Sequence, residues 1–111
     1  MTVQDLQFKL MKSASFNSFN GEQVVEDLLA HENLWKGAIM DRAGYNQEID
    51  FIKLRDIEEG EWNVDTLYIK SSHIDDEKLE LLAKTWEADE VAWEEVDLGG
   101  PREKVLRVWW D

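Results

Sequence analysis

Residues 65–86, DTLYIKSSHIDDEKLELLAKTW, decide the fold because their hydrophobic spacing changes from a period of two to a helical period. In the first part, Leu67 and Ile69 alternate with polar neighbours, which predicts a strand at 65–71 with one apolar side. In the second part, apolar residues recur at i, i+3, i+4 and i+7, which predicts one buried helix face formed by Leu79, Leu82, Ala83 and Trp86. This half of the chain therefore predicts a strand followed by a helix.

Two helices are predicted from their start signals. Asp75 is a side chain suited to cap the helix just described, and Asn20 is suited to cap an earlier one, with Gln23 placed to complete a capping box. In each case an apolar residue before the cap can pack against one in the second turn: Ile74 with Leu79, and Phe19 with Val24. The earlier helix then buries a stripe formed by Val24, Val25, Leu28 and Leu29.

Further strands are predicted at 36–42, 49–56, 90–96 and 104–110, with turns at 43–47, at 58–63 around Gly60, and at 99–101. Residues 3–12 fit two patterns. Leu6, Phe8 and Leu10 alternate as in a strand, whereas Val3, Leu6 and Leu10 fit a helix, and we favour the strand. The order is then β-α-β-β twice. The predicted fold class is α+β, a mostly antiparallel sheet with two helices on one face, built from two βαββ units and ferredoxin-like in general shape.

Length, composition and charge limit the classes of function. The chain has 111 residues and is 43% hydrophobic, which predicts one folded domain, 1–111. It has no cysteine, no signal-like start and no apolar run long enough to span a membrane, so we expect a cytoplasmic protein. Its 25 acidic and 12 basic residues give a net charge of −13, which disfavours binding to nucleic acids and anionic membranes. The charge could attract a basic protein partner, and the alternative is that it serves solubility alone.

One face of the predicted sheet combines rings with cations. Side chains that alternate with the apolar positions in 49–56, 65–71 and 104–110 would lie together on that face if these strands were neighbours. Such a face could bind a planar or anionic ligand by stacking and charge-assisted hydrogen bonds. The alternative is a solvent-exposed face whose cations pair with nearby carboxylates. The candidate ligand-binding residues are Lys53, Arg55, Tyr68, Lys70, Arg107 and Trp109.

Other residues point to a partner more than to catalysis. Trp62 lies in the acidic segment 58–65, where a ring either covers the core or contacts a partner, and we treat it as a candidate partner-binding residue. His31 and His73 lack a metal-ligand spacing, and no nucleophile, phosphate loop or EF-hand pattern is present, so we expect no catalytic residue, no metal and no cofactor.

Three hypotheses follow for function. The leading one is a non-enzymatic protein-binding or regulatory module, and the sequence leaves open whether it forms a homo-oligomer. The alternative is a small-molecule site, or an enzyme, on the aromatic and basic sheet face. A third is an acidic mimic of DNA that inhibits a basic protein.

Overall fold

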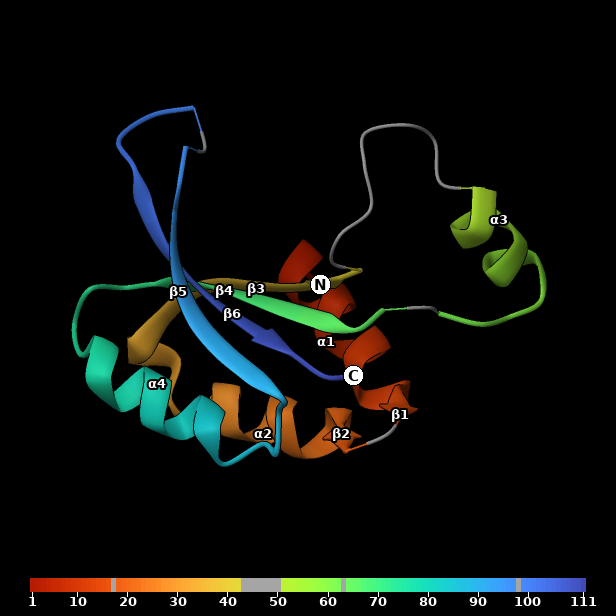
Figure 1. The fold of residues 1–111 in the computed structure, drawn as a ribbon, viewed down its shortest axis with the longest axis horizontal. Coiled ribbons are helices and arrows are strands. Elements are labelled where there is room, and N and C mark those ends of the chain that lie inside the picture. Colours follow the sequence, from red (N-terminus) through yellow and green to blue (C-terminus); the bar gives the residue numbers. More distant parts are fainter. Residues whose placement is uncertain (17, 43–50, 63, 98) are drawn as a thin grey trace.

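The computed structural model describes residues 1–16, 18–42, 51–62, 64–97 and 99–111. The chain is an α+β protein (Figure 1), as the sequence predicts. Its elements, in chain order, are α1 (Val3–Ser13), β1 (Ser15–Phe16), β2 (Phe19–Asn20), α2 (Gly21–Ala30), a short 3-10 helix η1 (Glu32–Leu34), β3 (Trp35–Asp41), α3 (Phe51–Glu58), β4 (Thr66–Ser71), α4 (Asp76–Lys84), β5 (Glu90–Val96) and β6 (Glu103–Trp109).

The main sheet has four antiparallel strands in the order β3-β4-β6-β5, and β1 and β2 form a separate short pair. Helices α2 and α4 cover one face of this sheet, and the opposite face, called the outer face below, carries neither of them (Figure 1). The four predicted strands that match β3, β4, β5 and β6 are confirmed within a residue or two at each end.

The core lies between the sheet and these helices. The alternation predicted for two strands is confirmed, because Leu67, Ile69, Leu106, Val108 and Trp110 are all completely buried. The helices supply the opposing layer with Val24, Val25, Leu28, Leu79, Ala83 and Trp86.

Both predicted N-caps are confirmed. Asn20 Oδ1 accepts a hydrogen bond from the Gln23 amide at 3.2 Å, and Asp75 Oδ1 accepts one from the Lys78 amide at 3.0 Å. Two finer expectations differ. The side chain of Gln23 donates to Asp27 rather than back to the cap, and Ile74 stays 66% exposed, so it does not bury against the second turn of α4.

The strand favoured for residues 3–12 is wrong, because this segment is helix α1. Thr2 and Asp5 form a reciprocal capping box, with amide-to-side-chain distances of 2.9 and 3.1 Å. Phe8 is buried while Leu6 and Leu10 are each about half exposed, an arrangement that strand alternation does not allow.

The strand predicted at 49–56 is also wrong where the structure describes it, because Phe51–Glu58 is helix α3. Gly60, which suggested a turn between strands, is the stop signal of this helix: its φ is 78°, its amide donates to the Ile57 carbonyl, and the Glu61 amide donates to the Asp56 carbonyl. Residues 49–50 and the turn predicted at 43–47 lie outside the described residues. Four α-helices, rather than two, are present in the described ranges, and the two halves do not share a βαββ plan.

Helix α1 covers the free edge of β3. Gln4 Nε2 donates to the Ala38 carbonyl at 2.7 Å, and Gln4 Oε1 accepts from the Ala38 amide at 2.8 Å. Gln7 Oε1 accepts from the Met40 amide at 3.1 Å. The crossing of α1 and α2 depends on Gly21, since a Cβ there would lie 1.7 Å from the Met11 carbonyl oxygen. Side chains of α1 therefore satisfy both backbone groups of Ala38 and the amide of Met40 on this edge.

Candidate functional site

Four of the six predicted ligand-binding residues lie together on the outer face of the sheet. Strands β4 and β6 are neighbours, and Tyr68 is the direct cross-strand partner of Arg107. Lys70 lies next along β4, and Trp109 lies two positions beyond Arg107 on β6. The prediction that these strands share a face of rings and cations is thus correct for two of its three strands.

Lys53 and Arg55 do not join this face. Both belong to α3, which stands apart from the sheet (Figure 1). Arg55 Nη2 contacts Asp56 Oδ1 at 2.9 Å. The error has a physical origin, because parity assigns sides only within a strand, and α3 is a helix.

The cations of the outer face are already paired with carboxylates. Arg107 Nε donates to Glu94 Oε1 at 3.0 Å, and its Nη2 donates to Glu90. The hydrogen bonds to Glu90 and Glu94 raise the pKa of Arg107 above its ordinary value. Lys70 Nζ lies 3.4 Å from Glu103 Oε1. Burial, followed by the charge of Glu94, raises the pKa of the Tyr68 hydroxyl, which therefore stays protonated at neutral pH.

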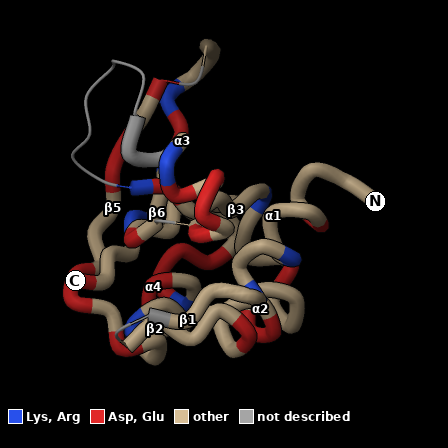
Figure 2. The backbone as a smooth tube through the Cα atoms, turned by 90° about the vertical axis from the view of Figure 1, so that its right-hand side faces the viewer, with Lys and Arg blue, Asp and Glu red and all other residues tan. Residues whose placement is uncertain are grey.

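A second edge of the sheet, along β5, is acidic. Residues 89–97 read DEVAWEEVD, with five carboxylates and no lysine or arginine. Acidic positions also outnumber basic ones over the rest of the backbone (Figure 2). We call residues 89–97 the acidic edge. Sequence analysis identified the strand but not its position at the end of the sheet, since strand order is not visible in a periodic pattern.

The backbone of β5 offers hydrogen-bonding groups on its outer side. Alternate residues of an antiparallel strand bond to opposite neighbours. The Trp110 amide donates to the carbonyl of Asp65, just before β4. The backbone groups of the alternate residues of β6 therefore face β5: Trp109, Arg107 and Val105, which pair with Glu90, Ala92 and Glu94. The backbone N–H and C=O groups of the remaining residues of β5 point away from the sheet; these residues are Val91, Trp93 and Glu95. No described residue forms a hydrogen bond to these outward groups.

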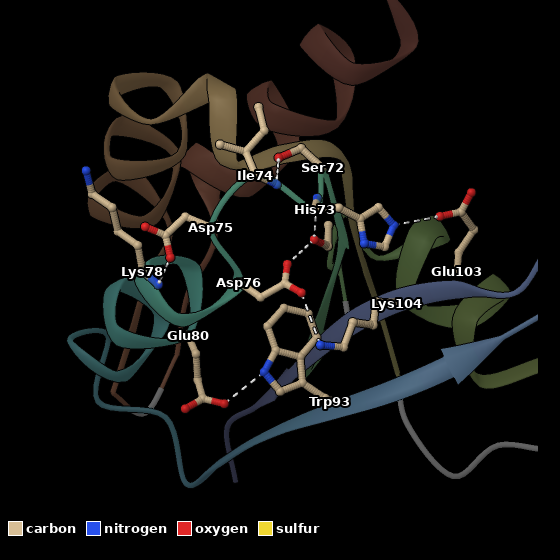
Figure 3. Close-up of polar contacts among 11 residues, drawn as sticks. Ser72, His73, Ile74, Asp75, Asp76, Lys78, Glu80, Trp93, Glu103 and Lys104 are labelled. Atoms are coloured by element: carbon tan, nitrogen blue, oxygen red, sulfur yellow. Dashed lines mark hydrogen bonds and ion pairs between the residues drawn. The ribbon is translucent and has the colours of Figure 1, made fainter.

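Side chains of α4 and β6 hold the middle of β5 from the core side (Figure 3). Trp93 Nε1 donates to Glu80 Oε1 at 2.8 Å. Lys104 Nζ lies 4.9 Å from the centroid of the Trp93 ring and donates to Asp76 Oδ2 at 3.0 Å. The hydrogen bond from Ser71 to Asp76, followed in strength by that from Lys104, lowers the pKa of the Asp76 carboxyl. The network fixes the position of the acidic edge.

The same region does not form a catalytic triad. Ser71 is completely buried, its hydroxyl donates to Asp76, and its oxygen accepts from the His73 backbone amide at 2.8 Å. The His73 ring points instead to Glu103, with 3.5 Å between Nε2 and Oε2 (Figure 3). The His73 imidazole is therefore not placed to accept the proton of the Ser71 hydroxyl.

Two tryptophans from the predicted sets meet at one cavity. Trp62 and Trp109 line a cavity of about 730 Å³ at the end of the sheet. A second hollow, of about 440 Å³, lies between α1 and the outer face and is lined by Tyr68 and Lys70 with mainly apolar neighbours. Asp56, Glu59 and Glu61 also come within 4.8 Å of one another, but Asp56 is engaged by Arg55 and nothing further indicates an ion there.

Comparison with known proteins identifies no relative. No family model matches the chain, and no curated protein or solved structure is similar to it. Within the described residues, every helix is too short or too polar to cross a membrane. The acidic edge and the cavity that Trp62 and Trp109 line are therefore the features from which a function can be inferred.

Proposed function

We propose that the chain is a protein-binding module that takes up an extended, basic segment of a partner protein as an additional strand along β5. The observation that carries the proposal is the acidic edge, whose five carboxylates, three of them within β5, lie along outward backbone groups that have no partner among the described residues. Backbone hydrogen bonds would supply affinity, and the carboxylates would select lysine and arginine.

The geometry of β5 supports strand addition. An incoming strand needs an edge that is already extended, because ordering a loose one costs conformational entropy. β5 pairs with β6 without a register shift over its seven residues, and Trp93 is fixed by Glu80 and Lys104. Arg107 neutralises part of the charge of Glu90 and Glu94, yet the acidic edge keeps an excess of carboxylates over the two arginines that contact it, Arg102 and Arg107.

The two other hypotheses receive less support. An anionic ligand on the outer face would have to compete with Glu90, Glu94 and Glu103 for the cations that they hold. A mimic of DNA would also recognise a basic partner, but it would make no use of the outward backbone groups of β5. Strand addition accounts both for the carboxylates of the acidic edge and for the outward backbone groups of β5.

Peptide titration tests the proposal. The probe is a nine-residue peptide of alternating lysine and valine, titrated into the ¹⁵N-labelled protein. We expect the largest amide shifts at Val91, Trp93 and Glu95, and affinity that falls at least tenfold between 0.05 and 0.5 M salt, because exposed charges are screened. Shifts centred on another part of the molecule would contradict the proposal.

Two N-methylated versions of the peptide provide matched controls. N-methylation removes an amide donor without changing charge. In one version the methyl groups lie on the residues whose amides would face β5, and in the other on the alternate residues. We expect only the first to lose binding. Equal binding by the two versions would reject strand addition while leaving an electrostatic partner in place.

A further inference from the structure

The cavity lined by Trp62 and Trp109 has a chemical character of its own. Its volume is about 730 Å³, and it lies between the end of α1, the segment before β4, and the last residues of the chain. It is lined by Ser13, Ala14, Ser15, Gly60, Glu61, Trp62, Val64, Asp65, Trp109, Trp110 and Asp111. Three of these are carboxylates, three are tryptophans, and none is a lysine or an arginine.

The two partly exposed rings come from positions fixed by the fold. Trp62 is half-buried and packs against the hydrophobic core. Trp109 is held in β6 between its cross-strand partners Thr66 and Glu90. The third ring, Trp110, is completely buried, and its Nε1 donates to the Trp86 carbonyl at 3.1 Å. The rings thus need little ordering before a ligand binds.

Aromatic rings and carboxylates together recognise organic cations. The face of an indole ring carries negative potential and attracts an ammonium group, more strongly where water is partly excluded. Carboxylates at the rim add a longer-range attraction for positive charge and repel anions. A metal ion would need several oxygen ligands around one point, whereas this lining combines its three carboxylates with three tryptophans. The lining therefore fits a bulky organic cation better than a small inorganic one.

We propose that this cavity binds an organic ammonium group, with Trp62 and Trp109 in contact with the cation and Glu61 supplying charge at the rim. The group could belong to a free amine or to a lysine side chain, since both present the same chemistry. The site is separate from strand addition at β5 and does not depend on it.

Choline and its neutral isostere, 3,3-dimethyl-1-butanol, test the charge requirement on the whole protein. The two molecules have nearly the same shape and differ in the charge of one centre. We expect choline to shift the indole Nε1 proton resonances of Trp62 and Trp109 and to bind at least tenfold more tightly than the alcohol. Equal binding, or shifts only at other residues, would overturn the proposal.

Substitutions in the cavity test whether choline binds there. We expect Trp62→Leu to weaken choline binding at least tenfold, Trp62→Phe to weaken it less, and Glu61→Gln to weaken it severalfold. Trp35→Phe, which changes a tryptophan outside both the cavity and β5, should leave binding unchanged. If Trp62→Leu does not fold, the comparison of choline with its isostere on the unaltered protein still decides the question.

Capped lysine and capped trimethyl-lysine distinguish the sources of the ammonium group. Binding of either capped residue as tightly as choline identifies a side chain of another protein as the ligand. Binding of choline alone identifies a free quaternary amine. Failure of all three compounds would reject the site, whatever the result of the peptide titration at β5.

Discussion

The two edges of the main sheet are treated in opposite ways. Along β3, Gln4 and Gln7 of α1 hydrogen-bond the outward backbone groups of Ala38 and Met40. Along β5, Val91, Trp93 and Glu95 point their backbone groups outward without a partner among the described residues. One edge is closed by a helix, and the other is left open and acidic.

The difference between the two edges agrees with the proposal that a partner binds at the open one. An unprotected edge invites pairing between copies of the same chain, and proteins usually block it with a cover or with charge. The acidic edge makes two copies repel each other at β5, because both would bring the same carboxylates together. A basic strand meets no such repulsion, so under the proposal the charge would disfavour pairing of two copies and favour a complementary partner.

Removal of the Phe8 side chain should have the largest effect on the difference between the two edges. Phe8 is buried and its ring packs edge-on against Trp35, with 5.4 Å between centroids, which holds α1 beside β3. We expect Phe8→Ala to lower the free energy of unfolding by about 3–5 kcal/mol, measured by urea denaturation. With α1 loosened, light scattering should show association that the unaltered protein lacks. Leu6→Ala, on the exposed side of the same helix, is the control and should change little.

Replacement of Gln4 tests whether the hydrogen bonds from α1 protect the edge of β3. Gln4 satisfies both backbone groups of Ala38, so Gln4→Ala leaves a donor and an acceptor without partners at a partly buried position. We expect a loss of about 2 kcal/mol, roughly 1 kcal/mol for each hydrogen bond, with faster amide exchange at Ala38. Lys9→Ala, on the exposed surface of α1, serves as the control. An unchanged stability would show that water replaces the glutamine and that β3 needs no cover.

Local patterns predicted the parts of the fold that depend on neighbours in sequence. The alternation in 65–71 and 104–110 assigned core and outer faces correctly, and the caps at Asn20 and Asp75 were correct. For α1 both periods fitted, and the capping box of Thr2 and Asp5, present in the sequence, would have favoured the helix. For α3, interpreting Gly60 as the end of a helix, and not as a turn between strands, would likewise have favoured a helix.

The candidate site depends on neighbours in space, which a single sequence does not reveal. Tyr68 and Arg107 meet because β4 pairs with β6, across a connection that contains α4 and β5. The pairing of Arg107 with Glu90 and Glu94 depends on β5 lying beside β6 at the end of the sheet. Whether a strand is central or at an edge is a property of the whole sheet, and the acidic edge could be recognised only from it.

Loss of the Trp93 hydrogen bond should loosen the open edge alone. Trp93→Phe keeps a ring for Lys104 and removes the donor to Glu80. We expect a loss of about 1 kcal/mol and faster amide exchange at Val91 and Glu95, with no change at Ala38 on the closed edge. Glu80→Gln keeps an acceptor for the indole and should have a smaller effect. Equal acceleration at both edges would mean that the sheet opens as one unit.

Acid should weaken the contacts that hold β5 from its core side, and we expect the smallest effect among the four changes. The hydrogen bond from Ser71, together with Lys104, lowers the pKa of Asp76 in the folded protein below its ordinary value of 3.8. The stabilisation from Asp76 is therefore fully present above about pH 4 and is lost as the pH falls through the lowered pKa. The effect is small because Lys104 and Asp76 are partly exposed, at 41% and 27%.

Urea denaturation of the unaltered protein and of Asp76→Asn, from pH 6 to pH 2.5, measures this effect. We expect the difference in stability between the two proteins to shrink on the acid side. A difference that stays constant through this range would mean that the carboxylate of Asp76 does not support β5, and that the position of the acidic edge comes from the packing of Trp93 and its hydrogen bond to Glu80.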